Sequence, residues 1–456
     1  MKNSRGKRSS LLRPLAIFSV FLAIVVAGLL VAFSVWFGSY IRSESFRAMI
    51  AEKTGNAFDS NAGFSPLRWT GASAYAESAT LEGSPSSALK SLNARELRAE
   101  MNWRAAFSGS WRVEEITITR LDGEWQLLDR NHATPPSAHG VSATKAVSPS
   151  GFFALLPRKF ELGILNIGNA NLRFGGAEIA GTSVIVKPDG TGWLFEGKGG
   201  RFTSTWTPGL EITDFRIREQ GKDFFLTQGN LRLGPNGKIL LSGESSSGGK
   251  LEISWDGISS SDVLKGKWIS RLQGILSGNA TLAAPDVCKG SVALRDGLLE
   301  NMPMLATIAD FTQNPTFRRM PLQELRGDFA WRNNAWHMSN FAAESKGLLK
   351  IEGSVVIGKG GGTLDGDFQI GVTPQTLQWL PGSRERVFTK SHDGYLWTDL
   401  KVGGTMDKPT ENLSGRLRSA MGGELIERGS ELIKNAPDNA VKGVKGVLDI
   451  LRPLVP

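Results

Sequence analysis

Apolar and polar residues alternate along much of the chain beyond about residue 103, as they do in strands with one buried face. The alternation is clear in Leu251–Trp255, in Gly347–Ile357 and in Thr363–Val372. Groups of turn-forming residues separate such runs, among them Gly175-Gly176 and residues 358–362. The pattern predicts a mainly β fold, built as a long antiparallel meander with one apolar and one polar face.

Three stretches predict other elements. Ser43–Lys53 predicts a short helix that ends by Gly55, and Gly297–Phe311 predicts a helical insert between strands. Beyond residue 411, apolar residues at helical spacing predict C-terminal amphipathic helices, which either pack on the sheet or serve as an end cap or membrane-surface helix. Trp111–Leu128 predicts a hairpin that turns at Asp122-Gly123.

Leu15–Phe37 is uncharged and almost wholly apolar, which predicts an N-terminal transmembrane helix. At roughly 1.5 Å per residue it reaches about 34 Å, enough to cross a hydrocarbon core of roughly 30 Å. The basic stretch Met1–Arg13 predicts a cytoplasmic N-terminus, with the rest of the chain exported, in a bacterium to the periplasm. An ordinary long signal peptide is the alternative. The expected membrane-anchor residues include Leu15, Phe18, Phe21, Leu29 and Trp36.

Composition narrows the classes of function. The formal net charge is +9, but five basic residues lie before residue 14, so the exported part is only weakly basic and no nucleic-acid partner is expected. Cys288 is the single cysteine, which excludes an intramolecular disulfide and a thiolate metal cluster. We expect a small buried or half-buried residue there, not a nucleophile.

Changes in pattern and composition divide the chain into six predicted parts. The segment 129–150 contains Pro135-Pro136 and many serine and alanine residues, which is typical of a flexible linker or long loop. The parts are a cytoplasmic basic segment (1–14), a transmembrane helix (15–37), an N-terminal α+β module (41–128), the linker (129–150), a β-rich body (151–410) and a C-terminal helical tail (411–456).

The sequence carries no catalytic signature. No phosphate-binding loop or nucleophile elbow occurs, and no pair of histidines has the spacing of metal ligands. His337 and His392 stand alone, and carboxylates are scattered over the polar faces of strands. We therefore predict no catalytic residue, no cofactor and no metal site, although paired-carboxylate glycan hydrolysis is kept as a third alternative.

Several segments resemble, in their order, the AsmA-like family of bacterial inner-membrane-anchored envelope proteins. The most specific stretch runs from a short leucine turn at Ser261–Leu264, through a glycine-centred strand, to Gly290–Leu305. The other similar segments are Phe46–Gly55, Asn93–Leu97, Val113–Thr119, Arg271–Gly274, Leu276–Gly278, Leu322–Phe329, Trp336–Met338, Leu348–Gly353 and Val402–Thr405 with Pro409.

This resemblance implies an elongated, curved β-sheet with an apolar inner face, open as a groove, that binds or conveys phospholipid in envelope maintenance. Such a groove binds acyl chains through buried area, so it leaves no polar motif. The expected lining residues are Leu251, Ile253, Leu349, Ile351, Phe368 and Ile370. Expected partners are membrane lipids and an envelope protein. The alternative function is an anchored scaffold that docks an envelope protein through its edge strands.

Overall fold

The structure is a computed structural model of the chain, and its description covers only part of the residues. The described residues are 38–85, 87–102, 110–126, 159–205, 207–221, 223–245, 249–266, 268–283, 287–300, 302, 305–306, 309, 314–378, 382–406 and 408–420. The chain is mainly β and forms two compact units. Unit 1 comprises residues 1–188 and 197–205, and unit 2 comprises residues 189–196 and 206–456.

Four predicted segments lie outside the described residues. They are the cytoplasmic basic segment 1–14, the transmembrane helix 15–37 with Leu15, Phe18, Phe21, Leu29 and Trp36, the linker 129–150, and residues 421–456 of the helical tail. Within the part of the chain that the structure describes, no helix combines the length and the apolar character that a membrane crossing requires.

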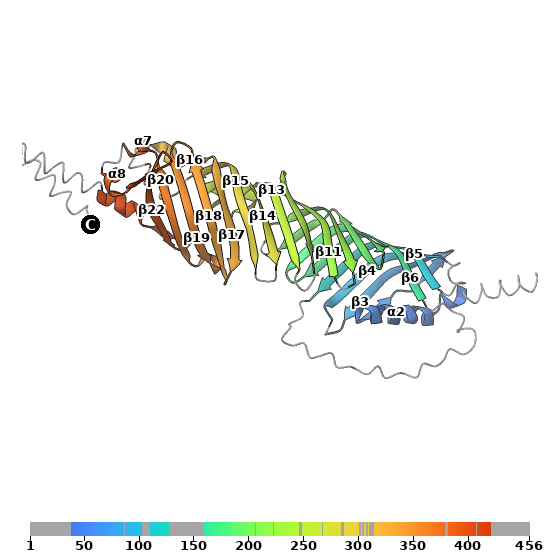
Figure 1. Ribbon diagram of the computed structural model, residues 1–456. Coiled ribbons are helices and arrows are strands. Elements are labelled where there is room, and N and C mark those ends of the chain that lie inside the picture. Colours follow the sequence, from blue (N-terminus) through green and yellow to red (C-terminus); the bar gives the residue numbers. More distant parts are fainter. Residues whose placement is uncertain are drawn as a thin grey trace, which may run out of the picture. The chain divides into compact units, whose positions relative to one another are not determined.

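Unit 1 consists of a sheet and one long helix (Figure 1). β1 and β2 both pair with β3, and pairing continues through β4, β5, β6, β7 and β9. The elements are α2 (Glu44–Phe58), β1 (Ser60–Phe64), β2 (Arg68–Thr70), β3 (Ser73–Gly83), β4 (Leu89–Asn102), β5 (Ser110–Trp125), β6 (Lys159–Phe174), β7 (Ala177–Asp189) and β9 (Arg201–Ser204).

The predicted helix in unit 1 is confirmed, but it is longer than predicted. Ser43 caps α2, since its hydroxyl accepts a hydrogen bond from the Phe46 amide at 3.2 Å. The helix continues past Gly55 to a left-handed cap at Asp59. Gly55 is buried inside the helix because the chain returns against it: a Cβ there would lie 2.5 Å from the Ser60 carbonyl oxygen. The glycine therefore marks a close contact and not the helix end.

The predicted hairpin at Asp122-Gly123 is wrong. β5 runs unbroken through both residues, which pair with β4 on one side and with β6 on the other. The ring of Trp125 occupies the space above Gly123, with ring carbons 2.6 and 2.8 Å from an ideal Cβ. β5 and β6 are also parallel, unlike the antiparallel meander predicted, and the chain from 126 to 158 supplies the long connection that parallel strands need.

Unit 2 is a second, longer run of strands with short helical turns. The strands are β8 (Gly192–Lys198), β10 (Leu210–Gln220), β11 (Asp223–Leu233), β12 (Gly237–Glu244), β13 (Lys250–Ser259), β14 (Leu272–Ala283), β15 (Cys288–Glu300), β16 (Arg319–Leu322), β17 (Glu324–Arg332), β18 (Ala335–Ser345), β19 (Leu349–Gly358), β20 (Leu364–Val372), β21 (Lys390–His392), β22 (Tyr395–Gly404) and β23 (Pro409–Glu411). The short helices are α4 (Ser260–Val263), α5 (Trp268–Arg271), η3 (Pro315–Arg318), η4 (Lys359–Gly361), α7 (Pro374–Leu377) and α8 (Ser383–Arg386).

The strands of unit 2 form the predicted antiparallel meander. From β10 to β15, and then through β17, β18, β19, β20, β22 and β23, successive strands pair antiparallel, as their side-by-side order in Figure 1 shows. β16 adds to β15, and β21 adds to β22. Bulges interrupt the pairing of β13 with β14, of β17 with β18 and of β18 with β19. A bulge bends and twists its strand, so these positions help to curve the sheet.

The helical predictions in unit 2 are confirmed only in part. Gly297–Glu300 is not helical, because β15 continues through it and pairs with β16; residues 305, 306 and 309 are helical. Residues 413–420 are helical as predicted. Leu413 and Leu417, from the predicted apolar stripe, are buried there, so the described part of this helix packs against the protein.

Candidate functional site

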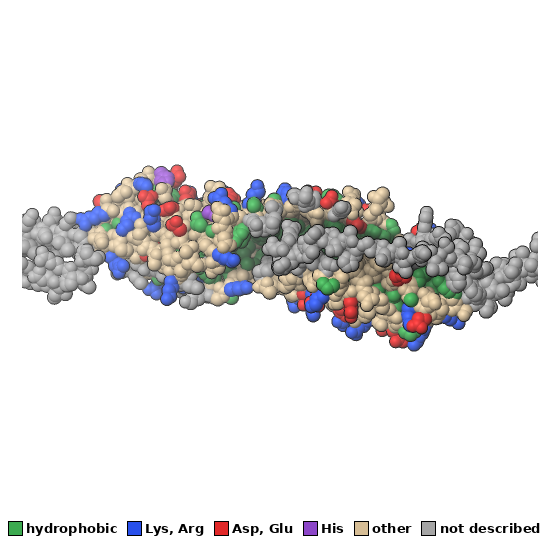
Figure 2. Space-filling model, turned by 90° about the horizontal axis from the view of Figure 1, so that it is seen from below, with side chains coloured by type: hydrophobic (Ala, Val, Ile, Leu, Met, Phe, Trp, Pro, Cys, Tyr) green, Lys and Arg blue, Asp and Glu red, His purple; other side chains and the backbone are tan. Residues whose placement is uncertain are grey.

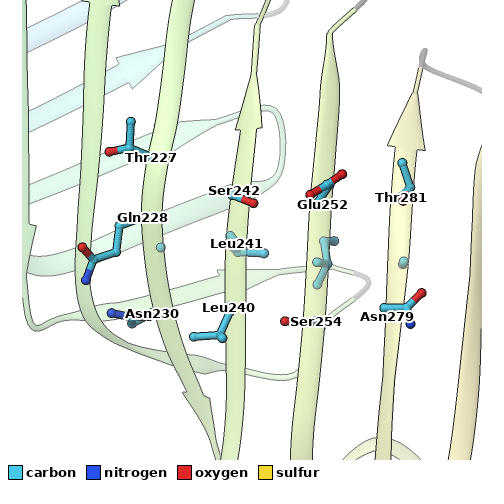
Figure 3. Close-up of a pocket in the computed structure, with 13 residues that line it drawn as sticks. Thr227, Gln228, Asn230, Leu240, Leu241, Ser242, Glu252, Ser254, Asn279 and Thr281 are labelled. Atoms are coloured by element: carbon cyan, nitrogen blue, oxygen red, sulfur yellow. The ribbon is translucent and has the colours of Figure 1, made fainter.

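The strands β11–β14 have one polar face and one apolar face. Figure 3 shows the polar face, which we call the outer face and which holds a shallow depression of about 540 Å³. Its amides pair with neighbouring polar groups: Gln228 and Asn230 donate to Asp214 Oδ1 at 2.9 and 2.8 Å. Asn279 donates to Ser291 Oγ at 3.1 Å. These contacts are typical of a sheet face in contact with water.

The opposite, inner face of the same sheet carries an apolar hollow of about 490 Å³. This volume lies within the range of roughly 300–1,000 Å³ that is usual for small-molecule sites. Figure 2 shows hydrophobic side chains recessed between polar rims in this part of unit 2. The lining residues are Thr207, Pro208, Leu210, Leu233, Ile239, Ile253, Trp255, Ile258, Val263, Leu276, Val292, Phe329, Trp336, His337, Met338 and Ile357.

A row of aromatic rings forms the floor of the hollow across β13, β17 and β18. Trp255 stacks on Phe329 with ring centroids 6.4 Å apart, and Phe329 meets Trp336 edge to face at 5.9 Å. Gly278, which pairs with Trp255, leaves room for its indole, since a Cβ there would lie 2.6 Å from the ring. The ring therefore lies close to the sheet and leaves space above it, as aromatic residues opposite strand glycines do.

Polar chemistry is nearly absent from the lining. Thr207 already has a partner within the protein. His337 lies between Trp336 and Met338 on β18, so strand alternation places its side chain on the outer face. Cys288 begins β15 on the inner face and is half-buried, and burial raises the pKa of its thiol. A thiol of raised pKa stays protonated and is a poor nucleophile.

Further along the same inner face, a hydrophobic core replaces the open hollow. We call this the closed core. Its centre contains Leu349, Ile370 and Leu400 from β19, β20 and β22, with 1%, 0% and 3% of their surface exposed. Segments outside these strands cover this part of the sheet. The covering residues include Leu305, Phe317, Leu377, Val387, Phe388, Leu413 and Leu417.

The cover is fastened by Arg416, on the helix formed by residues 413–420. Its guanidinium donates to the Thr398 hydroxyl at 2.6 Å and to the Asp399 carbonyl oxygen at 2.7 Å, both on β22. A longer bond of 3.4 Å reaches the Val387 carbonyl oxygen. One charged side chain thus joins the helix, the sheet and the segment after α8.

The six predicted lining residues divide between the two regions. Ile253 lines the hollow, and Leu251 lies two residues before it on the same face, half-buried. The expectation that Leu349 and Ile370 border an open groove is wrong, because the closed core buries both. Ile351 and Phe368 pack against that core and are half-buried.

Sequence reasoning missed the aromatic floor. Trp255, Phe329 and Trp336 sit in strands that the alternation pattern identifies, but each strand's partner cannot be read from the pattern. The available signal was the combination of large rings with strand glycines such as Gly278. The order of the strands, together with the glycines Gly278 and Gly290 beneath the rings, brings these residues together.

Charged groups cluster on the outer face of the strands that carry the closed core. Lys350 pairs with Glu352, whose hydrogen bond raises the pKa of the lysine, and its ammonium lies 5.8 Å from the centre of the Trp397 ring. Burial raises the pKa of Tyr395, whose hydroxyl donates to Glu344 at 3.1 Å. Among the residues that the structure describes, no group of three or more metal-ligating side chains comes together.

Comparison with protein-family models, with curated proteins and with solved structures finds no match to this chain. The similarity to AsmA-like proteins therefore stays a prediction. Any functional proposal rests on the inner face itself.

Proposed function

We propose that this chain is a single-pass inner-membrane protein of envelope maintenance, anchored by residues 15–37, whose exported sheet binds or conveys phospholipid along its apolar face. The apolar hollow is the observation that carries this proposal. Large side chains such as Trp336, 40% exposed, line it without a cover in the described part of the chain. Acyl chains gain roughly 25 cal/mol for each Å² of apolar surface buried, and they need no polar partner.

The alternative, docking of an envelope protein through an edge strand, has weaker support. β23, which ends the meander of unit 2, is only three residues long and begins with Pro409. Proline lacks the amide hydrogen that a sheet edge would donate, and short strands offer few hydrogen bonds to an added strand. A partner that adds to this edge would gain little.

Photo-crosslinking of the full-length protein in its membrane tests the proposal. A phospholipid with a diazirine in its acyl chain should label residues of the hollow, such as Ile253 and Met338, in addition to the anchor. Labelling confined to the anchor would overturn the proposal, because the anchor contacts lipid whatever the sheet does.

Two neighbouring residues of β19 supply a matched pair of variants. Ile357 lines the hollow, whereas Val356 lies on the opposite face and is 37% exposed. Ile357→Asp should lower labelling of the hollow at least about tenfold, because a carboxylate desolvated against an acyl chain costs several kcal/mol. Val356→Asp should leave labelling unchanged. Equal effects from the two variants would contradict binding on the inner face.

A further inference from the structure

The boundary between the apolar hollow and the closed core is formed by two phenylalanines. Phe341 lies on β18, three residues beyond Met338 of the hollow lining, across the bulge in that strand. Phe368 lies on β20. Both pair in register with Gly353 of β19, which stands between them. Their rings meet edge to face with centroids 5.7 Å apart.

The ring of Phe368 extends toward the hollow. It leans over Gly366, two residues earlier on the same face: a Cβ at Gly366 would lie 2.6 Å from ring atom Cε2 and 3.4 Å from the Val355 side chain. Gly366 is buried, although no side chain of its own fills the position. The phenyl ring thus fills the inner face beside Val355, where the row of exposed apolar residues would otherwise continue.

The pair is supported from behind. Phe368 is opposite Leu400 on β22, which is 3% exposed, and it packs against the closed core. On the other side, Phe341 lies next to Gly327 and Met338. A Cβ on Gly327 would lie 3.7 Å from the Cα atom of Phe341 and 3.4 Å from the Cγ atom of Met338. An apolar chain that ran along the aromatic floor toward β20 would meet these two rings before it met the core.

We infer that Phe341 and Phe368 form the end wall of the apolar hollow and set the length of the acyl chain that the hollow accepts. This inference rests on the proposed function. The two rings block the end of the hollow that is nearest the closed core. Lipid therefore enters and leaves the hollow without passing over β20 and β22. The ligand is the acyl chain of a phospholipid, as in the proposed function.

A chain-length series tests this inference on the full-length protein. Saturated fatty acids of increasing length compete with the diazirine phospholipid for labelling of the hollow. Each methylene that becomes buried should strengthen competition about fourfold. The gain should stop once the chain reaches the wall, and the length at this plateau is the quantity to measure.

The variants should move the plateau in opposite directions. Phe341→Ala and Phe368→Ala should shift it to chains about two or three methylenes longer, because each removes a phenyl ring from the path. Phe341→Trp should shift it to shorter chains. Phe224→Ala is the matched control, because Phe224 pairs with Phe195 at 6.5 Å elsewhere in unit 2 and should leave the plateau unchanged.

Three outcomes are distinguishable. A plateau that moves as described supports the end wall. An unmoved plateau in Phe341→Ala and Phe341→Trp proteins that still label and melt as the wild type does would overturn it, while leaving the proposed function intact. Absence of labelling and competition at every chain length would overturn the proposed function, and the end wall with it.

Discussion

The apolar hollow and the closed core occupy the same face of the same sheet, yet one is open and the other is filled. Both are built from strands with alternating apolar residues, and both Ile253 in the hollow and Ile370 in the core are isoleucines on the inner face. The difference lies in the connecting segments. Beyond β20 and β22, helical turns and residues 413–420 fold back over the sheet, whereas the connection between β13 and β14, which holds α4 and α5, contributes Val263 to the lining of the hollow.

This contrast shows that an apolar strand face does not specify its own cover. A sheet buries its apolar face only if another layer is available to it. In the closed core the cover comes from segments outside the strand pattern, including Phe317 and Leu417, which are 0% and 1% exposed. In the hollow, no segment that the structure describes covers the aromatic floor, and Trp336 is 40% exposed.

The largest expected effect is a loss of stability when an isoleucine of the closed core is truncated to alanine. The matching isoleucine of the hollow is the comparison. Ile370→Ala should lower the free energy of unfolding by roughly 2–5 kcal/mol, because it leaves a cavity in a packed core. Ile253→Ala should cost less than about 1 kcal/mol, because its side chain is already half-exposed. Urea unfolding of the two variants measures both values. Similar costs at the two sites would mean that the hollow is packed as tightly as the core.

A smaller loss of stability is expected when the hydrogen bonds that hold the cover on the closed core are removed. Arg416→Ala removes three hydrogen bonds from a charged donor and should lower the free energy of unfolding by roughly 1–3 kcal/mol. Arg418→Ala, two residues later on the same helix, is the matched control. Among the residues that the structure describes, Arg418 bonds only Ser414 of its own helix, and its loss should cost no more than about 0.5 kcal/mol. Thermal unfolding compares them, and equal losses would contradict the role of Arg416 as a fastening.

The smallest expected effect is a pH dependence of stability from an ion pair on the strands of the closed core. Lys390 donates to Asp399 at 2.9 Å, and this hydrogen bond lowers the pKa of the carboxyl group. A carboxyl whose pKa is lower in the folded state stabilises the fold above its unfolded pKa of about 3.9, and this contribution disappears as the pH falls further. Because both side chains are exposed, we expect less than about 1 kcal/mol.

Asp399→Asn tests this dependence. The variant should melt slightly below the wild type at pH 6, and the difference should shrink as the pH falls below about 3.9, as measured by thermal unfolding at decreasing pH. Glu252→Gln, which removes the exposed partner of Lys250 on the outer face, is the matched control. A constant difference between wild type and Asp399→Asn at every pH would contradict the assigned ion pair.

Much of the fold could be predicted from local pattern. The mainly β character, the helix that begins after Ser43, and the turns at Gly175-Gly176 and at residues 358–362 all result from residue preferences over short stretches. The errors occurred where a distant contact outweighed a local preference. Gly123 is typical of a turn, but pairing with β4 on one side and with β6 on the other holds it within β5.

The sequence by itself determined which residues of each strand share a face, because alternation has a fixed period of two residues. It therefore identified Leu251 and Ile253, and equally Leu349 and Ile370, as one apolar class. Only the tertiary structure decided that Ile253 borders a hollow while Leu349 and Ile370 are sealed in a core. The physical reason is that burial depends on the second layer, and residues distant in the sequence supply that layer. The pairing of the strands likewise brought Trp255 near Phe329, to give the hollow its floor, and Phe341 beside Phe368.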